Sequence, residues 1–292
     1  MKKVAKLAKP YQIDDGRHFR LKDFDPGDTG EFPSKEQAQE ALEAGMAQLR
    51  DLQDKLYAQQ RWAVLLILQG MDAAGKDSVI KHVMSGVNPQ GCHVHSFKAP
   101  SEEELSHDYL WRTNRQLPGR GQIGIFNRSY YEEVLVVRVH NELLQKQRIP
   151  PALINKDIWK QRFEDMAGFE RYLTRDGIVV RKFFLNLSKE EQKRRFLKRL
   201  EEPEKNWKFS PADIHERALW DDYMDAYEDM IRHTASAEAP WYVIPADNKW
   251  FTRVVVAAAV VHTLEKLRLT YPKLDPAKRK ELEAARGVLE KE

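Results

Sequence analysis

The sequence predicts an α/β fold in which helices cover both faces of a parallel sheet. Residues 62–68, WAVLLIL, are apolar without polar alternation, as in a strand that is buried on both faces. Four further short apolar segments follow and alternate with helical patterns, which is the sequence order of βαβ units. The 292 residues are 42% hydrophobic, enough for a substantial core. We therefore expect a three-layer sandwich around a five-stranded parallel sheet.

The first elements are an arm and a capped helix. Residues 1–33 contain several Pro and Gly residues and no clear periodicity, so we expect an extended N-terminal arm. Ser34 begins a helix with Gln37 in the capping-box position, and an apolar stripe from Ala38 to Leu56 marks its buried face. The first predicted strand, residues 62–68, follows this helix.

The loop after the first strand is a candidate anion site. Its residues, GMDAAGK, match the pattern G-x-x-x-x-G-K, and a helix from Lys76 to Ser85 follows. Gly70 and Gly75 allow backbone N–H groups to turn inward, and the helix N-terminus adds partial positive charge. Lys76 supplies a full charge for phosphate oxygens. We interpret the segment as a P-loop rather than a chance Gly-Lys turn, with phosphate contacts from Gly70, Ala73, Ala74, Gly75, Lys76 and Asp77.

Two carboxylates distinguish this loop from an ordinary P-loop. Asp77 occupies the position where such loops usually place Ser or Thr for magnesium, and Asp72 lies inside the loop. A negative charge there would repel phosphate unless a metal lay between them. Asp72 is therefore a candidate Mg²⁺ ligand, or it orients the attacking oxygen. The alternative is that Asp72 is a turn residue that caps the helix.

The middle of the chain continues the alternation of strands and helices. A turn at 88–91 precedes a short second strand, and Ser101 with Glu104 begins a helix that ends at Pro118. Two further helices are expected at about 130–137 and 152–175. The remaining strands are expected at 92–97, 122–126, 178–187 and 241–244, followed by a long helix at about 248–269 and a charged tail at 276–292.

The strand at 122–126 ends in polar residues at the same sheet edge as the P-loop, where ligands of parallel sheets bind. Asn127 occupies the position where P-loop proteins often have an Asp that binds magnesium. A neutral amide, unlike a carboxylate, cannot balance the charge of the metal ion. Arg128 can donate two hydrogen bonds to phosphate oxygens. Glu132 and Glu133 could restore the missing carboxylate, or they could simply stabilise a helix N-terminus.

A basic segment follows the fourth strand. Residues 189–208 contain eight Lys or Arg side chains, while Phe196, Leu197 and Leu200 mark a buried side. Such a charge run is usually a solvated helix face. This segment begins at the same sheet edge as the P-loop and leads into a second helix after Ser210. We therefore expect residues 189–235 to form a basic helical lid over the phosphates.

The composition excludes several classes of protein. The formal net charge of +3 gives no sign of nucleic-acid binding, and no apolar stretch approaches membrane-spanning length. The N-terminus has no apolar signal-peptide core. The single cysteine, Cys92, excludes an internal disulfide and suits a reducing cytosol. We expect a cytoplasmic homo-oligomer, dimer or tetramer, that binds neither membranes nor nucleic acid.

At these motifs the sequence resembles the second polyphosphate kinase family. The matching stretches are residues 70–91, 97–112, 125–139, 204–217 and 239–250. The resemblance implies Mg²⁺-dependent phosphoryl transfer from inorganic polyphosphate to a nucleotide, reversibly, on a single P-loop kinase-like domain, residues 1–292, with a helical lid. The sequence Asn127-Arg128-Ser129 resembles the group that phosphorylates AMP as well as ADP, giving ADP and ATP, because the ADP- or GDP-preferring members have Asp at the first position.

The resemblance also implies roles for individual residues. It implies a catalytic centre of Asp72, Lys76, Asn127 and Arg128, with the metal at Asp72 and Asn127. The expected contacts to the phosphate chain are Lys81, Arg181, Arg199 and Lys208. We place the acceptor nucleotide over residues 82–112, with contacts from Asn88, Pro89, Trp111, Arg112 and Glu133.

Two alternative functions remain open. An ATP-dependent nucleoside monophosphate kinase could use the same fold, although Asp77 in place of Ser or Thr argues against it. A non-enzymatic P-loop protein could bind RNA or DNA through residues 189–208, although no aromatic-rich readout motif supports this.

Overall fold

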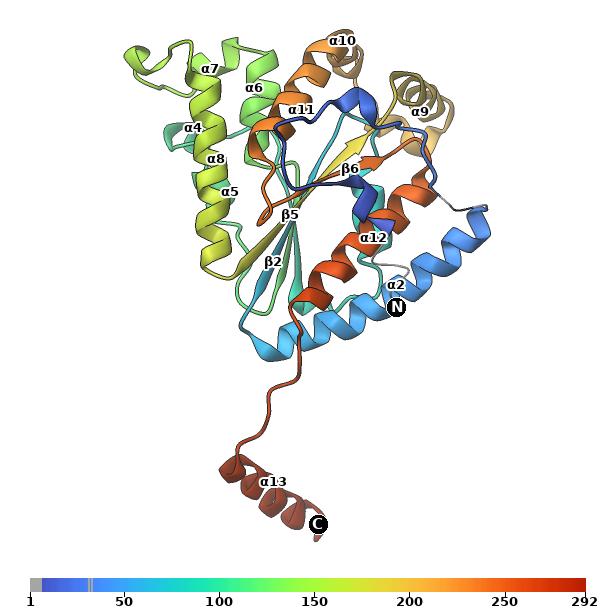
Figure 1. The fold of residues 1–292 in the computed structure, drawn as a ribbon, viewed down its shortest axis with the longest axis vertical. Coiled ribbons are helices and arrows are strands. Elements are labelled where there is room, and N and C mark those ends of the chain that lie inside the picture. Colours follow the sequence, from blue (N-terminus) through green and yellow to red (C-terminus); the bar gives the residue numbers. More distant parts are fainter. Residues whose placement is uncertain (1–6, 31, 33) are drawn as a thin grey trace.

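The structure, a computed structural model, describes residues 7–30, 32 and 34–292 and has a central sheet with helices on both faces (Figure 1). The sheet has six strands in the order β1-β6-β5-β2-β4-β3. Their bounds are β1 Gln12–Ile13, β2 Ala63–Gln69, β3 Cys92–Ser96, β4 Ile123–Asn127, β5 Ile178–Asn186 and β6 Trp241–Pro245. Strand β2 is buried along its whole length, as its apolar run predicts.

The expectation of a five-stranded parallel sheet is wrong by one strand. Strand β1 lies in the segment predicted as an irregular arm and pairs antiparallel with β6, Gln12 opposite Tyr242. Two residues are too few to show a strand periodicity, and their partner is far away in the sequence. The other four strand pairs are parallel. Residues 1–6, 31 and 33 of the predicted arm lie outside the described residues.

Two hydrophobic cores lie on opposite faces of the sheet. One core lies under α2 (Lys35–Gln59), α3 (Lys76–Val83) and α12 (Lys249–Lys266). The other packs beneath α8 (Ile158–Arg175) and α11 (Trp220–Thr234), together with the turn around Tyr130 and Tyr131. Figure 1 shows α2 and α12 crossing on one side of the sheet and α8 on the other. The predicted layers are therefore present.

Several predicted helices are shorter or more broken than the sequence suggests. The capping box of Ser101 and Glu104 is present, but the helix ends at Ser106, and α5 begins at Trp111 after a turn in which Asp108 accepts from the Leu110 N–H. The short α-helices of this half of the chain are α4 Glu102–Ser106, α5 Trp111–Asn114, α6 Val136–Val139 and α7 Glu142–Lys146. Its 3₁₀ segments are η1 Lys9–Tyr11, η2 Leu21–Asp23, η3 Pro89–Gly91, η4 Tyr130–Val134 and η5 Pro151–Leu153.

The parts of the predicted lid, residues 189–235, differ in how much of their side chains is buried. Helix α9 (Lys189–Glu201) begins at Ser188, whose hydroxyl accepts from the Glu191 N–H. The 3₁₀ segment η6 (Pro203–Lys208) and helix α10 (Ala212–Ala218) contain no buried residue in the described part of the chain. In contrast, α11 is a core helix with most of its apolar side chains buried. The predicted range 189–235 is therefore too wide, and residues 189–218 remain as a candidate lid.

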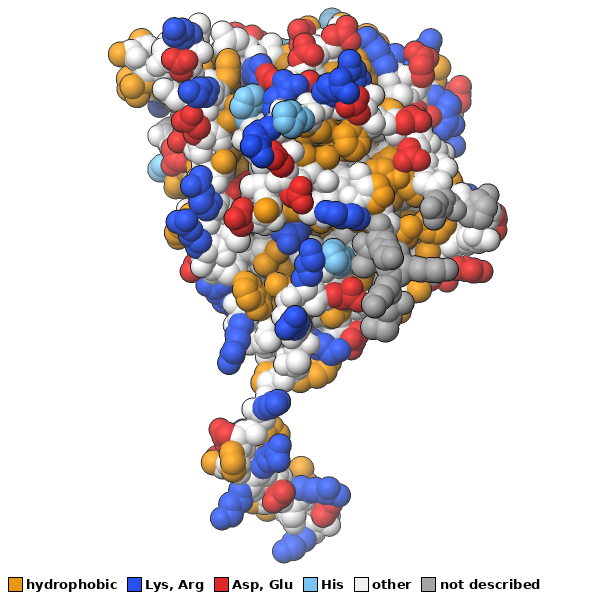
Figure 2. All heavy atoms as spheres, in the orientation of Figure 1, with side chains coloured by type: hydrophobic (Ala, Val, Ile, Leu, Met, Phe, Trp, Pro, Cys, Tyr) orange, Lys and Arg blue, Asp and Glu red, His pale blue; other side chains and the backbone are white. Residues whose placement is uncertain are grey.

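The charged tail forms a helix that stands apart from the body. Helix α13 (Pro276–Leu289) begins at Asp275, whose carboxylate accepts from the Lys278 N–H, and it buries no side chain against any described residue. Figure 1 shows an extended segment leading to it, and Figure 2 shows Lys and Arg side chains around it. None of the helices in the described ranges has the length and hydropathy that a bilayer-spanning segment needs.

Candidate active site

The loop at residues 70–75, which the sequence predicts to be a P-loop and which keeps that name below, connects the central strand β2 to helix α3. Its glycines are required by the backbone: Gly70 has a φ of +152° and a Cβ there would lie 3.0 Å from the Leu185 carbonyl oxygen, while Gly75 has a φ of +106°. Ala73 also has a positive φ, +64°, without being glycine. The chain thus accepts local strain in this loop.

Lys76 is held inside this loop. Its ammonium donates to the carbonyl oxygen of Gly70 at 2.6 Å and to that of Met71 at 3.3 Å. Burial, followed by the charge of Arg128, lowers the pKa of Lys76 to about 8, although Asp72 acts in the opposite direction. An anion bound in the loop would favour the charged ammonium and raise this pKa again.

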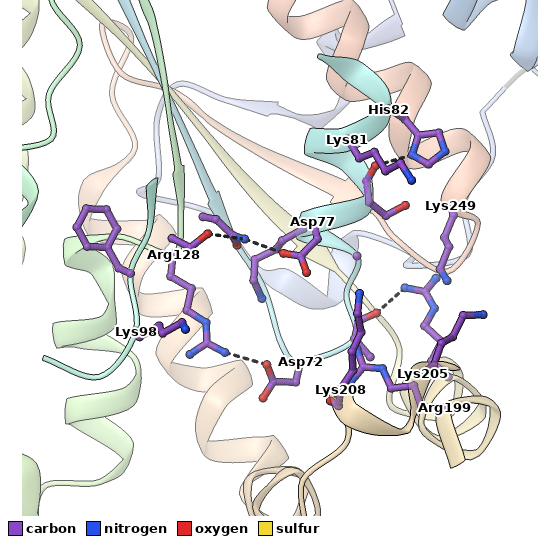
Figure 3. A pocket seen from close by; sticks show the side chains of 18 of the residues that line it. Asp72, Asp77, Lys81, His82, Lys98, Arg128, Arg199, Lys205, Lys208 and Lys249 are labelled. Carbon is purple, nitrogen blue, oxygen red and sulfur yellow. Dashed lines mark hydrogen bonds and ion pairs between the residues drawn. The ribbon is translucent and has the colours of Figure 1, made fainter. Parts of the chain in front are cut away.

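Arg128 and Asp72 form an ion pair across the mouth of the loop. Arg128 follows the end of β4 with a φ of +64°, and its Nη2 donates to Asp72 Oδ1 at 2.9 Å. Its Nη1 lies 3.8 Å from Glu132 Oε2. Figure 3 shows Arg128 and Asp72 pointing toward one another. Of the two candidate glutamates, Glu132 therefore faces the site, whereas Glu133 accepts from Gln147 at 2.6 Å in a neighbouring cluster.

Asn127 and Asp77 form a second contact that the sequence did not suggest. The Asn127 Nδ2 donates to Asp77 Oδ1 at 2.7 Å and lies 3.4 Å from the Ser96 hydroxyl. The amide therefore neutralises no charge but fixes the direction of the Asp77 carboxylate. An Asp at position 127 would instead place two carboxylates in contact.

The P-loop and the candidate lid enclose one strongly basic cavity (Figure 3). Its volume is about 850 Å³, and the described residues that line it include ten Lys or Arg and only two carboxylates. Ten residues predicted from the sequence meet there: Asp72, Ala73, Gly75, Lys76, Asp77, Lys81, Asn127, Arg128, Arg199 and Lys208. The structure thus brings together most of the predicted phosphate site.

Five cations of this cavity were not predicted as site residues: Lys98, Arg195, Lys198, Lys205 and Lys249. Lys98 follows β3 and Lys249 follows β6, both at the carboxyl edge of the sheet. The rule that ligands bind at the carboxyl ends of parallel strands, which selected Asn127, would therefore also have selected Lys98 and Lys249. Burial, followed by the charge of Arg195, lowers the pKa of Lys249 to about 8.

Three predicted contacts lie elsewhere. Arg181 is in the first half of β5, where its Nε donates to Thr263 Oγ1 at 3.2 Å and its Nη1 to the Glu238 carbonyl at 2.9 Å, so it is a structural residue under α12. Asn88 and Pro89 precede β3, at the amino end of the sheet. A five-residue strand, roughly 16 Å long, separates them from the cavity. These three assignments are corrected, because the positions of the strand ends exclude them.

The other predicted nucleotide contacts, Trp111, Arg112 and Glu133, do not line the cavity. Arg112 donates to the Lys98 carbonyl at 2.7 Å, and its guanidinium carbon lies 5.5 Å from the centre of the Phe97 ring. Trp111 stacks on His107, with ring centres 4.0 Å apart. Because Phe97 and Lys98 line the cavity, Arg112 contacts the site through them rather than directly.

Comparison with known proteins agrees with this geometry. Residues 33–271 match the family described as Polyphosphate kinase 2 (PPK2). An ADP-polyphosphate phosphotransferase of Rhodopseudomonas palustris is 52% identical over 275 residues, 91% of this chain and 95% of the relative. An AMP/ADP-polyphosphate phosphotransferase of Meiothermus ruber is 45% identical, covering 93% of this chain and 98% of the relative. The crystal structure of Polyphosphate Kinase 2 from Arthrobacter aurescens TC1 matches with a TM-score of 0.86 and 39% identity over 96% of both chains. This chain therefore belongs to the polyphosphate kinase 2 family.

Proposed function

We propose that this protein transfers the terminal phosphoryl group of inorganic polyphosphate to AMP and ADP, giving ADP and ATP, and that the reaction is reversible. The observation that supports this most is the cavity with ten cations and two carboxylates among its described lining residues. A phosphate chain carries about one negative charge per unit, so a long cationic wall binds it with a strong salt dependence, as nucleic acid is bound.

The residues nearest the loop fit the needs of phosphoryl transfer, which are alignment and neutralised charge. Lys76 and Arg128 come from different strand ends and face one cavity, so they can neutralise the transferred group from two sides. The Arg128–Asp72 pair, at 2.9 Å, holds the guanidinium in place before substrate arrives. Arg199 of α9 and Lys208 of η6 line the remaining wall, where they can bind the rest of the phosphate chain.

We propose Mg²⁺ as the cofactor. Magnesium usually takes one or two carboxylates, substrate phosphate oxygens and several waters rather than a closed set of protein ligands. The donor set fits: Asp72 and Asp77 line the cavity, and the described residues contain no cluster of three or more metal-binding side chains. Asp72 and the amide oxygen of Asn127 would hold the ion, with Asp77 nearby. When bound, it would offset charge on the phosphates.

We propose that residues 1–292 act as one P-loop kinase-like unit and that η6 with α10 forms the moving part of the lid. This part carries exposed apolar side chains, with Trp207 78% and Ile214 59% exposed, which closure over a substrate could cover. The free cysteine Cys92 fits a reducing compartment, and we propose a cytoplasmic enzyme.

A donor and acceptor assay tests the function. The purified protein is given polyphosphate of defined length with AMP or ADP, without ATP and with an adenylate kinase inhibitor, and products are separated by chromatography. We expect AMP to be converted to ADP and then to ATP. The Lys76→Ala variant should fold but lose roughly 10²–10³ in kcat, because a preorganised charge is removed. Turnover with ATP and AMP but none with polyphosphate would instead favour a nucleoside monophosphate kinase.

A further inference from the structure

Arg195 stands in the wall of the phosphate cavity, but its donors are already occupied. A guanidinium has five N–H groups. Its Nε donates to Glu191 at 2.7 Å, and its Nη1 donates to the carbonyl oxygens of Ala73 at 2.8 Å and Ala74 at 3.1 Å. Its Nη2 donates to the carbonyl oxygens of Ala246 at 2.5 Å and Asp247 at 3.0 Å. The side chain is only 6% exposed, so all five donors serve the protein itself.

Gln192, also on α9, binds a further backbone carbonyl group of the same loop. Gln192 is 1% exposed, and its Nε2 donates to the Asp72 carbonyl at 3.0 Å. Its own oxygen accepts from Arg217 at 3.1 Å, which fixes the orientation of the amide. Three consecutive carbonyl groups of the P-loop, those of residues 72, 73 and 74, therefore accept hydrogen bonds from one face of α9.

This arrangement has a direct consequence for anion binding. A loop that points its N–H groups at a phosphate must point its carbonyl groups elsewhere, and each buried carbonyl needs a donor. The positive φ of Ala73 is unfavourable for an L-residue, so contacts from outside the loop help to hold this conformation. The two Nη groups of Arg195 also tie this loop to the segment after β6.

We propose that Arg195, assisted by Gln192, is a positioning residue that holds the P-loop carbonyls so that its N–H groups are aligned for the transferred phosphate, and that Arg195 itself does not bind the phosphate chain. This rests on the proposed function. It divides the cations of α9 by role: Arg195 binds backbone, whereas Lys198, one turn further along the helix, lines the cavity, is 61% exposed and, among the described residues, forms an ion pair only with Glu202, at 3.5 Å from its Nζ. Helix α9 is then a fixed support, not a moving lid.

The test compares two replacements at position 195. Arg195→Lys keeps the charge but cannot reach four carbonyls, and Arg195→Met removes the charge as well. We expect both variants to lose tenfold or more in kcat, while the dependence of the polyphosphate KM on salt keeps its wild-type slope. Amide hydrogen exchange, measured without substrate, should rise in residues 70–76 and stay unchanged in β5. Lys193→Met is the control, because Lys193 is an exposed cation on the same helix and does not line the cavity, and it should behave as wild type.

The opposite pattern would overturn the proposal. If Arg195→Lys retains kcat and P-loop protection while Arg195→Met flattens the salt slope, Arg195 acts as a phosphate ligand through its charge. Should the Arg195 variants fail to fold, Gln192→Met removes one carbonyl contact and must still raise exchange in residues 70–76. Because exchange is measured without substrate, it tests the carbonyl contacts even if the wild type does not use polyphosphate, which would refute only the proposed function.

Discussion

Replacing the buried Lys182 by Met tests how the core supports Arg128. Lys182 and Glu170 have side chains 0% and 2% exposed and form an ion pair of 2.6 Å. The ammonium also donates to the Thr234 carbonyl at 2.7 Å. Glu170 Oε1 accepts from the hydroxyls of Tyr130 at 2.8 Å and Tyr131 at 2.6 Å. These two tyrosines come directly after Arg128-Ser129, so the ion pair anchors the turn that presents Arg128.

The size of the effect follows from what each variant leaves unpaired. Lys182→Met leaves the Glu170 charge buried, and breaking such a pair costs about 3–5 kcal/mol. The two tyrosine hydroxyls still donate to this carboxylate, so we expect the lower part of that range. Adding Glu170→Gln removes the charge but keeps an acceptor for the tyrosines. The double variant should therefore recover part of the loss and cost about 1–2 kcal/mol, because the Thr234 carbonyl still lacks its donor.

Urea unfolding and thermal unfolding measure this effect. A loss of about 3 kcal/mol in Lys182→Met corresponds to a Tm lowered by roughly 5 °C, because the entropy of unfolding of a chain of this size makes each kcal/mol worth about 1.6 °C. We also expect kcat to fall more than the KM for polyphosphate rises, because Arg128 stays in the cavity but loses its fixed direction. A matched control is Lys160→Met on the exposed side of α8, which should change neither quantity measurably. A stability loss below about 1 kcal/mol in Lys182→Met, or a double variant less stable than it, would refute the reasoning.

Three further predictions follow from the cavity. The pKa of Lys76, lowered to about 8 by burial, should make polyphosphate affinity high below pH 8 and weaker above it, because bound phosphate favours the charged ammonium. Calorimetry near pH 8, in buffers of different ionisation heat, should show that protons are taken up when polyphosphate binds. This uptake should be smaller in Lys76→Arg, and binding heats that are the same in all buffers would contradict the prediction. Neutralising Arg199 and Lys208 together should weaken polyphosphate binding and reduce its salt slope without changing the nucleotide KM; a raised nucleotide KM with an unchanged slope would assign them to another site. Asn127→Asp replaces the amide that donates to Asp77 at 2.7 Å by a second carboxylate. We expect this variant to turn over ADP in preference to AMP, and we expect its activity to depend more strongly on Mg²⁺, because a cation offsets the repulsion between the two carboxylates. An unchanged ratio of AMP to ADP turnover, measured by chromatography, would refute this.

The features that could be predicted from the amino-acid sequence are those that depend on local patterns. The apolar run of β2, the glycines at 70 and 75 and the caps at Ser34 and Ser101 are readable because each rests on a few consecutive residues. The rule that ligands bind at the carboxyl ends of parallel strands then brought Asn127 and Arg128 to the P-loop. The same rule, applied more strictly, would have excluded Asn88 and Arg181 and included Lys98 and Lys249.

The partners of these residues could not be predicted, because they come from distant segments that meet in the folded chain. Asn127 meets Asp77, Arg128 meets Asp72, and Arg195 meets the backbone of the P-loop across 121 or more positions of sequence. No local pattern separates Arg195, which binds carbonyl groups, from Lys198, which faces the cavity, since both belong to one basic segment. The direction of a side chain and the donors that remain free on it are set by burial and by contacts between distant segments. Those contacts exist only once the sheet has formed and α9 has packed against its edge.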